Sequence, residues 1–102
     1  MASITKKSDA HVLLVGECDI NEAIGLRGEL EILIRRAAGA PFEIGFQELT
    51  SVNSTILSLM LSCVRAADAA GCQLSMSGLP QKLYDMARVG GLESILPLTD
   101  TH

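Results

Sequence analysis

The sequence predicts an α/β protein with a mixed, mainly parallel β-sheet. Short apolar runs that are typical of strands alternate with longer segments of helical periodicity, and glycine or proline marks their boundaries. Strands that are separated by helices pair in parallel through right-handed crossovers. With two Phe, one Tyr and no Trp, the core must be aliphatic. A chain of 102 residues has the length of one domain, so residues 1–102 are interpreted as a single domain.

Strand patterns occur at several places along the chain. The first ten residues can hold a short edge strand, and His11–Cys18 is a compact apolar run that suits a strand buried on both faces. Phe42–Phe46 alternates between apolar and other residues, and Gln73–Gly78 forms another strand pattern. The short apolar segment Ile95–Leu98 is a candidate for one more edge strand.

Three segments have helical patterns between these strands. Asp19 or Asn21 can cap a first helix that runs to about Ala38. A second helix is expected over Ser54–Ala70, where Gly71 closes it. Pro80 sits at a first-turn position and opens a third helix, which runs to Val89 before two glycines.

The charge pattern excludes two classes of partner. The chain has 12 acidic and 8 basic residues, for a formal net charge of −4. Its basic residues cluster no further than the pairs Lys6-Lys7 and Arg35-Arg36, whereas nucleic acid binding needs a denser positive surface. For the same reason, we expect no direct binding to an anionic membrane surface.

The apolar runs and the cysteines indicate the cellular compartment in which the protein is expected. No segment approaches the roughly 20 apolar residues that are needed to cross a bilayer, and the first residues do not resemble a signal peptide. The three cysteines are odd in number and form no CxxC motif, which favours reduced thiols over a disulfide framework. We therefore expect a cytoplasmic protein that does not insert into the membrane.

Catalytic motifs are missing from the sequence. The only histidines are His11 and His102, and neither has Ser or Cys partners at a spacing that indicates nucleophilic catalysis. Phosphate-binding loops of the GxxxxGK[ST] or GxGxxG kind do not occur, and no residues have metal-ligand spacing. The sequence thus predicts no enzyme, with no catalytic residues, no cofactor and no metal.

The second predicted helix carries the most informative pattern. At 100° per residue its apolar side chains share one wide arc, which predicts the face toward the sheet: Ile56, Leu59, Met60, Cys63, Val64, Ala67 and Ala70. The opposite arc carries a continuous stripe, here called the serine stripe: Ser54, Ser58, Ser62 and Arg65. Two interpretations stay open, an ordinary solvent-facing helix surface and a shallow face on which another protein docks.

The start of this helix holds more polar residues than a cap requires. Asn53 is a good N-cap, because its side-chain oxygen can accept a hydrogen bond from a first-turn N–H. Ser54 and Thr55 project from the first turn, where the helix dipole favours negative charge. These two residues are therefore candidate phosphorylation sites, and Asn53, Ser54 and Thr55 join the serine stripe as the predicted partner-binding surface.

Several segments resemble the STAS domain, a module of sulfate transporters and anti-sigma-factor antagonists. Asn53–Leu57 stands where the family has Asp-Ser-Ser-Gly-Leu or Asp-Thr-Ala-Gly-Leu. Ala69–Leu79 resembles the family's helix end, glycine and strand, and Tyr84–Leu92 resembles its last helix and exit. The resemblance covers nearly the whole chain. It implies the STAS fold, with four to five strands and about three to four helices.

The compact length and the ending Val89–Pro97 are most similar to the small cytoplasmic subunit of Mla-type phospholipid ABC transporters. This resemblance implies a non-catalytic subunit that binds the transporter's ATPase within a complex with the permease and supports assembly and activity. Such a subunit serves outer-membrane lipid asymmetry and is held at the inner membrane through the complex. Ser54 takes the position of a Thr that is important in that subunit.

The family also offers a second interpretation, an anti-sigma-factor antagonist. Its partner would be a serine kinase that holds a sigma factor, and Thr55 takes the position that is phosphorylated in such antagonists. Two departures from the family pattern argue against this switch. Asn53 replaces the usual Asp, and Ile56 replaces the usual Gly. Neither departure removes the docking surface.

Overall fold

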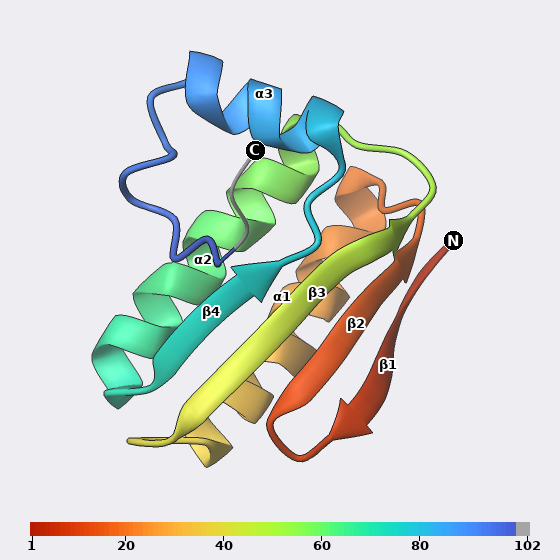
Figure 1. Ribbon diagram of the computed structural model, residues 1–102. Coiled ribbons are helices and arrows are strands. Elements are labelled where there is room, and N and C mark those ends of the chain that lie inside the picture. Colours follow the sequence, from red (N-terminus) through yellow and green to blue (C-terminus); the bar gives the residue numbers. More distant parts are fainter. Residues whose placement is uncertain (100–102) are drawn as a thin grey trace.

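The computed structural model describes residues 1–99 (Figure 1). Over this range the chain forms four strands and three helices. In chain order they are β1 (Ala2–Ser8), β2 (His11–Gly16), α1 (Ile20–Arg36), β3 (Pro41–Leu49), α2 (Ser54–Ala70), β4 (Gln73–Ser77) and α3 (Gln81–Val89). The element order and the bounds of α2 agree with the sequence prediction.

The strands form one sheet in the order β1-β2-β3-β4 within the described residues. β1 is an antiparallel edge strand, whereas β2 pairs with β3 and β3 with β4 in parallel. This arrangement confirms the predicted mixed, mainly parallel sheet. The candidate edge strand Ile95–Leu98 is reduced to a single bridge, in which Leu98 pairs with Met76. β2 ends at Gly16, before the predicted end at Cys18, whereas β3 extends beyond the predicted range Phe42–Phe46 at both ends.

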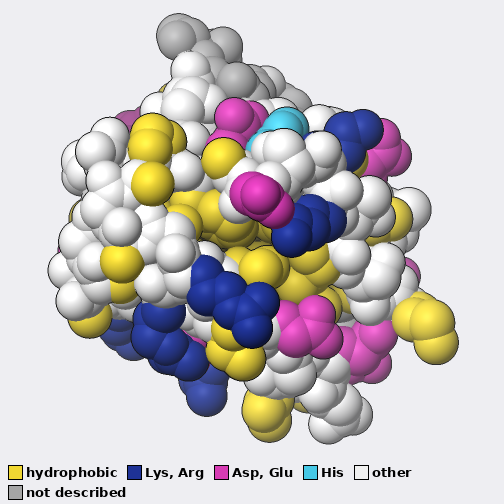
Figure 2. Space-filling view, turned by 90° about the horizontal axis from the view of Figure 1, so that it is seen from below, with side chains coloured by type: hydrophobic (Ala, Val, Ile, Leu, Met, Phe, Trp, Pro, Cys, Tyr) yellow, Lys and Arg dark blue, Asp and Glu magenta, His cyan; other side chains and the backbone are white. Residues whose placement is uncertain are grey.

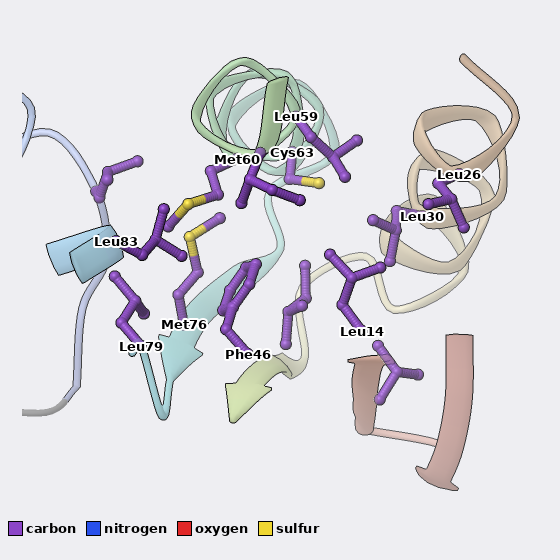
Figure 3. Packing of buried hydrophobic residues seen from close by; sticks show 14 of the residues in the cluster. Leu14, Leu26, Leu30, Phe46, Leu59, Met60, Cys63, Met76, Leu79 and Leu83 are labelled. Atoms are coloured by element: carbon purple, nitrogen blue, oxygen red, sulfur yellow. The ribbon is translucent and has the colours of Figure 1, made fainter. Parts of the chain in front are cut away.

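The helices α1 and α2 cover one face of the sheet, and α3 lies beyond the end of β4 (Figure 1). Figure 3 shows how the core fills the space between these layers: Leu14, Phe46 and Met76 rise from three neighbouring strands toward the helices. They meet side chains from all three helices, namely Leu26, Leu30, Leu59, Met60, Cys63 and Leu83. The core is aliphatic apart from Phe42 and Phe46, as the composition requires.

The strand β2 is buried on both faces, as its compact apolar run predicts. Val12, Leu13 and Leu14 are consecutive and all buried. Val12 and Leu14 belong to the main core, whereas Leu13 points to the opposite face of the sheet. There it packs over Gly45, because a Cβ at that glycine would lie 2.6 Å from Leu13 Cδ2. The missing side chain at residue 45 thus makes room for an aliphatic one.

Each long helix has a defined start. Asp19, and not Asn21, caps α1: its side chain accepts a hydrogen bond from Glu22 N at 2.8 Å, and Glu22 reaches back to complete a capping box. Asn53 caps α2 by accepting a hydrogen bond from Ile56 N, without a capping box. At its other end α2 stops at Gly71, whose φ of +69° is a left-handed conformation that suits glycine.

The three cysteines are free thiols in different surroundings. Cys18 and Cys63 are buried, whereas Cys72 is partly exposed. Burial raises the pKa of the Cys63 thiol from 9.0 to about 12, and the charge of Glu31 adds to this effect. The folded protein therefore holds the Cys63 proton over a pH range in which an unfolded chain would lose it.

This pKa predicts a loss of stability in alkaline solution. The stabilising effect is complete below pH 9.0 and decreases as the pH rises toward about 12, since only the unfolded chain ionises Cys63 in that window. Within this window the free energy of unfolding decreases by up to about 1.4 kcal/mol per pH unit. Urea unfolding of the wild type and Cys63→Ala should show a wild-type advantage that shrinks with rising pH. A constant difference across this window would contradict the prediction.

Candidate functional site

The junction between β3 and α2 is built around the side-chain amide of Asn53. Its Oδ1 accepts a hydrogen bond from Ile56 N at 3.1 Å, and its Nδ2 donates one to the carbonyl oxygen of Cys18 at 3.1 Å. Cys18 lies between β2 and α1, so this amide joins the starts of the two helices. An aspartate could provide the cap but could not donate to a carbonyl oxygen. The geometry therefore explains why an amide suits this position.

The residues after Asn53 point in different directions. Ser54 is exposed, and Thr55 is half-buried between α2 and α1. Ile56 is fully buried in the core, where it packs beneath the first turn. The extra bulk that replaces the family's glycine therefore lies inside the molecule. It does not block the surface of α2.

The serine stripe lies on one side of α2, away from the sheet. Ser54, Ser58 and Arg65 are exposed and Ser62 is partly exposed. Ser62 Oγ donates to the carbonyl oxygen of Ser58 at 3.1 Å, which holds this hydroxyl against its own helix. Together with Asn53 and Thr55 at the helix start, the predicted partner-binding residues thus share one surface. The buried arc consists of Ile56, Leu59, Met60, Cys63 and Ala67, while Val64 and Ala70 are partly exposed.

Sequence reasoning missed an apolar groove beside this stripe, between α1 and α2. Ile20 and Ile24 form its outer wall with exposed fractions of 71% and 69%, one helical turn apart. The groove has a volume of about 160 Å³ and is here called the isoleucine groove. It is lined by Ile20, Ala23, Ile24, Arg27, Thr55, Ser58, Leu59 and Ser62. A signal was available, because Ile20 and Ile24 fall outside the arc that Leu26 and Leu30 place in the core.

A second apolar hollow flanks α2 on its other side, toward α3. Leu57 of α2 lies there with Met86 and Val89 of α3, and the exposed fraction of Val89 is 85%. Single exposed apolar side chains are common, but here they line hollows on both sides of one helix. The surface of α2 is therefore a polar ridge between two apolar grooves.

The surface of α2 and its flanking hollows carries charges of both signs, with Arg65 and Asp68 exposed on α2 itself and Lys82 and Asp85 in the hollow toward α3. Arg65 and Lys82 have no carboxylate within 4 Å among residues 1–99. Arg27 lies 3.8 Å from Glu31 along the same helix. The first turn of α2 holds no acidic residue. A partner surface with carboxylates would complement these groups.

The end of the molecule that Figure 2 shows carries charges of both signs. Lys and Arg side chains are interspersed there with Asp and Glu, and apolar side chains are visible between them. Several of the Lys and Arg side chains gather on the lower left of this view, whereas most Asp and Glu side chains lie elsewhere on it.

The opposite face of the sheet holds a small polar cluster. Glu43 lies between two partners: it accepts a hydrogen bond from Ser77 Oγ, and its Oε2 lies 3.5 Å from His11 Nε2. The carboxylate, and not the imidazole, takes the hydroxyl hydrogen bond, so the cluster lacks the pairing of nucleophile and base that hydrolases use. Among residues 1–99, no group of three His, Cys, Asp or Glu side chains could hold a metal ion.

Comparison with protein families identifies the class of protein. A family model described as "Mlab, STAS domain" matches residues 2–98, which is nearly the whole chain. The chain therefore belongs to the STAS-domain family of the Mlab type. No catalytic family is indicated. A comparison with curated proteins finds no match.

Solved structures share the fold at low sequence identity. A Thermotoga maritima protein described as a candidate anti-sigma factor antagonist has a TM-score of 0.75 and 14% identity, and the match covers 98% of this chain and 86% of that one. The unphosphorylated anti-sigma factor antagonist SpoIIAA has a TM-score of 0.69 and 19% identity, with 100% and 89% covered. The phosphorylated Bacillus SpoIIAA gives 0.65 and 19%, with 100% and 92% covered. These matches show the STAS fold.

The helices of the described region are too short or too polar to span a bilayer.

The two hydrogen bonds of Asn53 generate a stability prediction. Asn53→Ala should lower the free energy of unfolding by about 1–2 kcal/mol, because it removes both the helix cap and the link to Cys18. Asn53→Asp should also be less stable than the wild type, by about 1 kcal/mol, since it keeps the cap but places a carboxylate against the Cys18 carbonyl.

Urea unfolding near neutral pH measures both variants. Asn21→Ala is the matched control, because Asn21 is exposed in the first turn of α1 and Asp19 provides the cap there. An Asn53→Asp variant as stable as the wild type would show that the amide donor contributes nothing.

Proposed function

We propose that this protein is the non-catalytic STAS subunit of a phospholipid ABC transporter of the Mla type. It binds the transporter's ATPase subunit through α2 and supports assembly and activity of the complex, which includes the permease. In this role it stays cytoplasmic and is held at the inner membrane through its partners. The transported lipid does not contact this chain, and the complex serves outer-membrane lipid asymmetry.

The observation that carries this proposal is the surface of α2 together with the family match. The surface combines exposed small polar side chains with apolar hollows on both sides of α2, and this arrangement supports a role in binding another protein. The family model whose description names Mlab supports the transporter as the setting. The polar cluster on the opposite face lacks a catalytic pairing, which favours a binding role.

An anti-sigma-factor antagonist is the second candidate, and the exposure of Ser54 favours it. Ser54 lies in the first turn of α2, where a phosphoryl group would be stabilised by the helix dipole. Thr55 is half-buried against α1, so Ser54 is the more accessible hydroxyl. In this interpretation phosphorylation of Ser54 or Thr55 would break a complex with a serine kinase.

Affinity capture decides between the two functions. The tagged protein is purified from its own cells in mild detergent, and its partners are identified by mass spectrometry. We expect an ABC ATPase and its permease. A serine kinase without any transporter subunit would contradict the transporter role and support the antagonist.

A charge on the serine stripe should prevent this binding. Ser58→Glu places a carboxylate in the middle of the stripe, and we expect the affinity for the ATPase to fall by about tenfold or more. The variant should fold normally, because Ser58 is exposed and Glu is a good helix former. Ser94→Glu, at an exposed serine beyond α3, is the matched control. Co-purification of the ATPase with folded Ser58→Glu would remove the stripe from the interface.

A further inference from the structure

We propose that the segment after α3, Leu92–Thr99, keeps the protein monomeric by covering the outer edge of β4. This segment is here called the C-terminal strap. When the strap is released, β4 pairs with β4 of a second copy of the chain. This inference is independent of the proposed function, because it concerns the isolated chain.

The strap is held to β4 at Met76. Met76 N–H donates to the carbonyl oxygen of Pro97 at 2.9 Å, and the carbonyl oxygen of Met76 accepts from Thr99 N–H at 3.0 Å and from Thr99 Oγ1 at 3.3 Å. Leu96, with an exposed fraction of 5%, fixes the strap in the core. Figure 1 shows this segment in dark blue as it returns from α3 to the side of β4. The strap thus occupies both backbone groups of Met76 that point away from β3.

The first half of the β4 edge is open. Gln73 N–H donates on the β3 side, to the carbonyl oxygen of Ala40 at 3.2 Å, whereas the groups of Met76 point outward. Because these directions alternate along a strand, the N–H and C=O groups of Leu74 also point outward. Among residues 1–99 the strap makes no backbone hydrogen bond to Leu74, and a hollow of about 260 Å³ lies between α2, β4 and the strap there. One open residue is too short for a strand pair, so the attachment at Met76 decides whether β4 can pair.

The two edges of the sheet differ in their protection. The edge strand β1 carries Lys6 and Lys7, and its register shifts between Lys6 and Ser8. Charged side chains and irregular register both discourage pairing with another chain. The edge strand β4 has neither a charged residue nor a proline. The strap therefore supplies the protection that the sequence of β4 lacks.

A second β4 fits this edge by symmetry. In an antiparallel, two-fold pair centred on Ser75, Leu74 of each copy lies opposite Met76 of the other. These are the residues whose N–H and C=O groups point outward, so each Leu74–Met76 pair exchanges both of its hydrogen bonds. The two Ser75 residues then face each other as a non-hydrogen-bonded pair, with Cα atoms about 4.5 Å apart. An uncharged strand brings no like charges together in this arrangement.

Full-length variants that loosen the strap test the proposal. Thr99→Pro removes both donors to Met76, and Leu96→Ser weakens the attachment to the core. In analytical ultracentrifugation the double variant Leu96→Ser/Thr99→Pro should self-associate at least about tenfold more tightly than the wild type. Circular dichroism and urea unfolding establish that the variant is folded. A folded double variant that stays monomeric would overturn the proposal, and if Leu96→Ser prevents folding, Thr99→Pro alone decides in the same way.

A charge at the symmetry axis distinguishes β4 pairing from any other association. Ser75→Lys places two ammonium groups directly opposite each other in the proposed pair, so its addition to the double variant should restore the monomer. Ser3→Lys, the same substitution at an exposed serine of β1, is the matched control and should leave the association unchanged. Self-association that persists in the presence of Ser75→Lys would overturn the proposal.

Disulfide trapping measures the register of the pair. The double variant also carries Cys72→Ser, which removes the partly exposed native thiol. In this background Ser75→Cys should form an intermolecular disulfide, because a Cα separation of about 4.5 Å permits one. Ser77→Cys is the matched control, since its two copies would lie roughly 14 Å apart along the strands. Equal crosslinking of Ser75→Cys and Ser77→Cys would overturn the proposed pair.

Discussion

The hydrogen bonds of the Asn53 amide connect two separate strand–helix junctions, and the shape of the candidate binding surface depends on them. One bond fixes the first turn of α2, and the other fixes the carbonyl of Cys18 just before α1. Because β2 and β3 are parallel, the two helices that follow them start at the same edge of the sheet and run in the same direction. The amide holds these starts together. The groove between α1 and α2 follows from this arrangement.

The two faces of the molecule differ in what they can do. On the helical side, the polar ridge of α2 lies between apolar hollows, so burial against another protein would remove apolar surface from water without exposing a core residue. On the other face, Glu43 is satisfied by Ser77 and lies near His11, and the cluster links β2, β3 and β4. Its role is most simply that of a cross-strand contact. We therefore place the proposed binding surface on the helical side.

The sequence predicted the sheet and α2 because those elements have strong local signals. Apolar runs between turn residues gave the strands, while Asn53 and Gly71 gave both ends of α2. The segment Ile95–Leu98 has the composition of a strand but forms only one bridge, because pairing depends on how the chain returns to β4 after α3. Composition alone does not contain that information.

The same limit applies to the functional surface. The serine stripe was visible because it lies on one helix with a period of 3.6 residues, whereas the groove requires the relative placement of two helices. Ile20 and Ile24 could be recognised as outside the buried arc of α1, but their neighbours Thr55 and Ser58 are more than thirty positions away in the chain. Only tertiary packing brings these residues together, and the periodicity of a single helix cannot predict how two helices pack.

The two departures from the family pattern have structural explanations that bear on function. The amide at residue 53 gains a donor that a carboxylate lacks, and the isoleucine at residue 56 fills the core where a glycine would leave space. We expect both residues to stabilise the junction. A phosphorylation switch requires a junction whose conformation changes when charge is added to the first turn. A docking surface instead gains affinity from a junction that is already rigid. The junction of this chain has the properties of a preorganised binding surface, which is why we favour the transporter subunit over the phosphorylation switch.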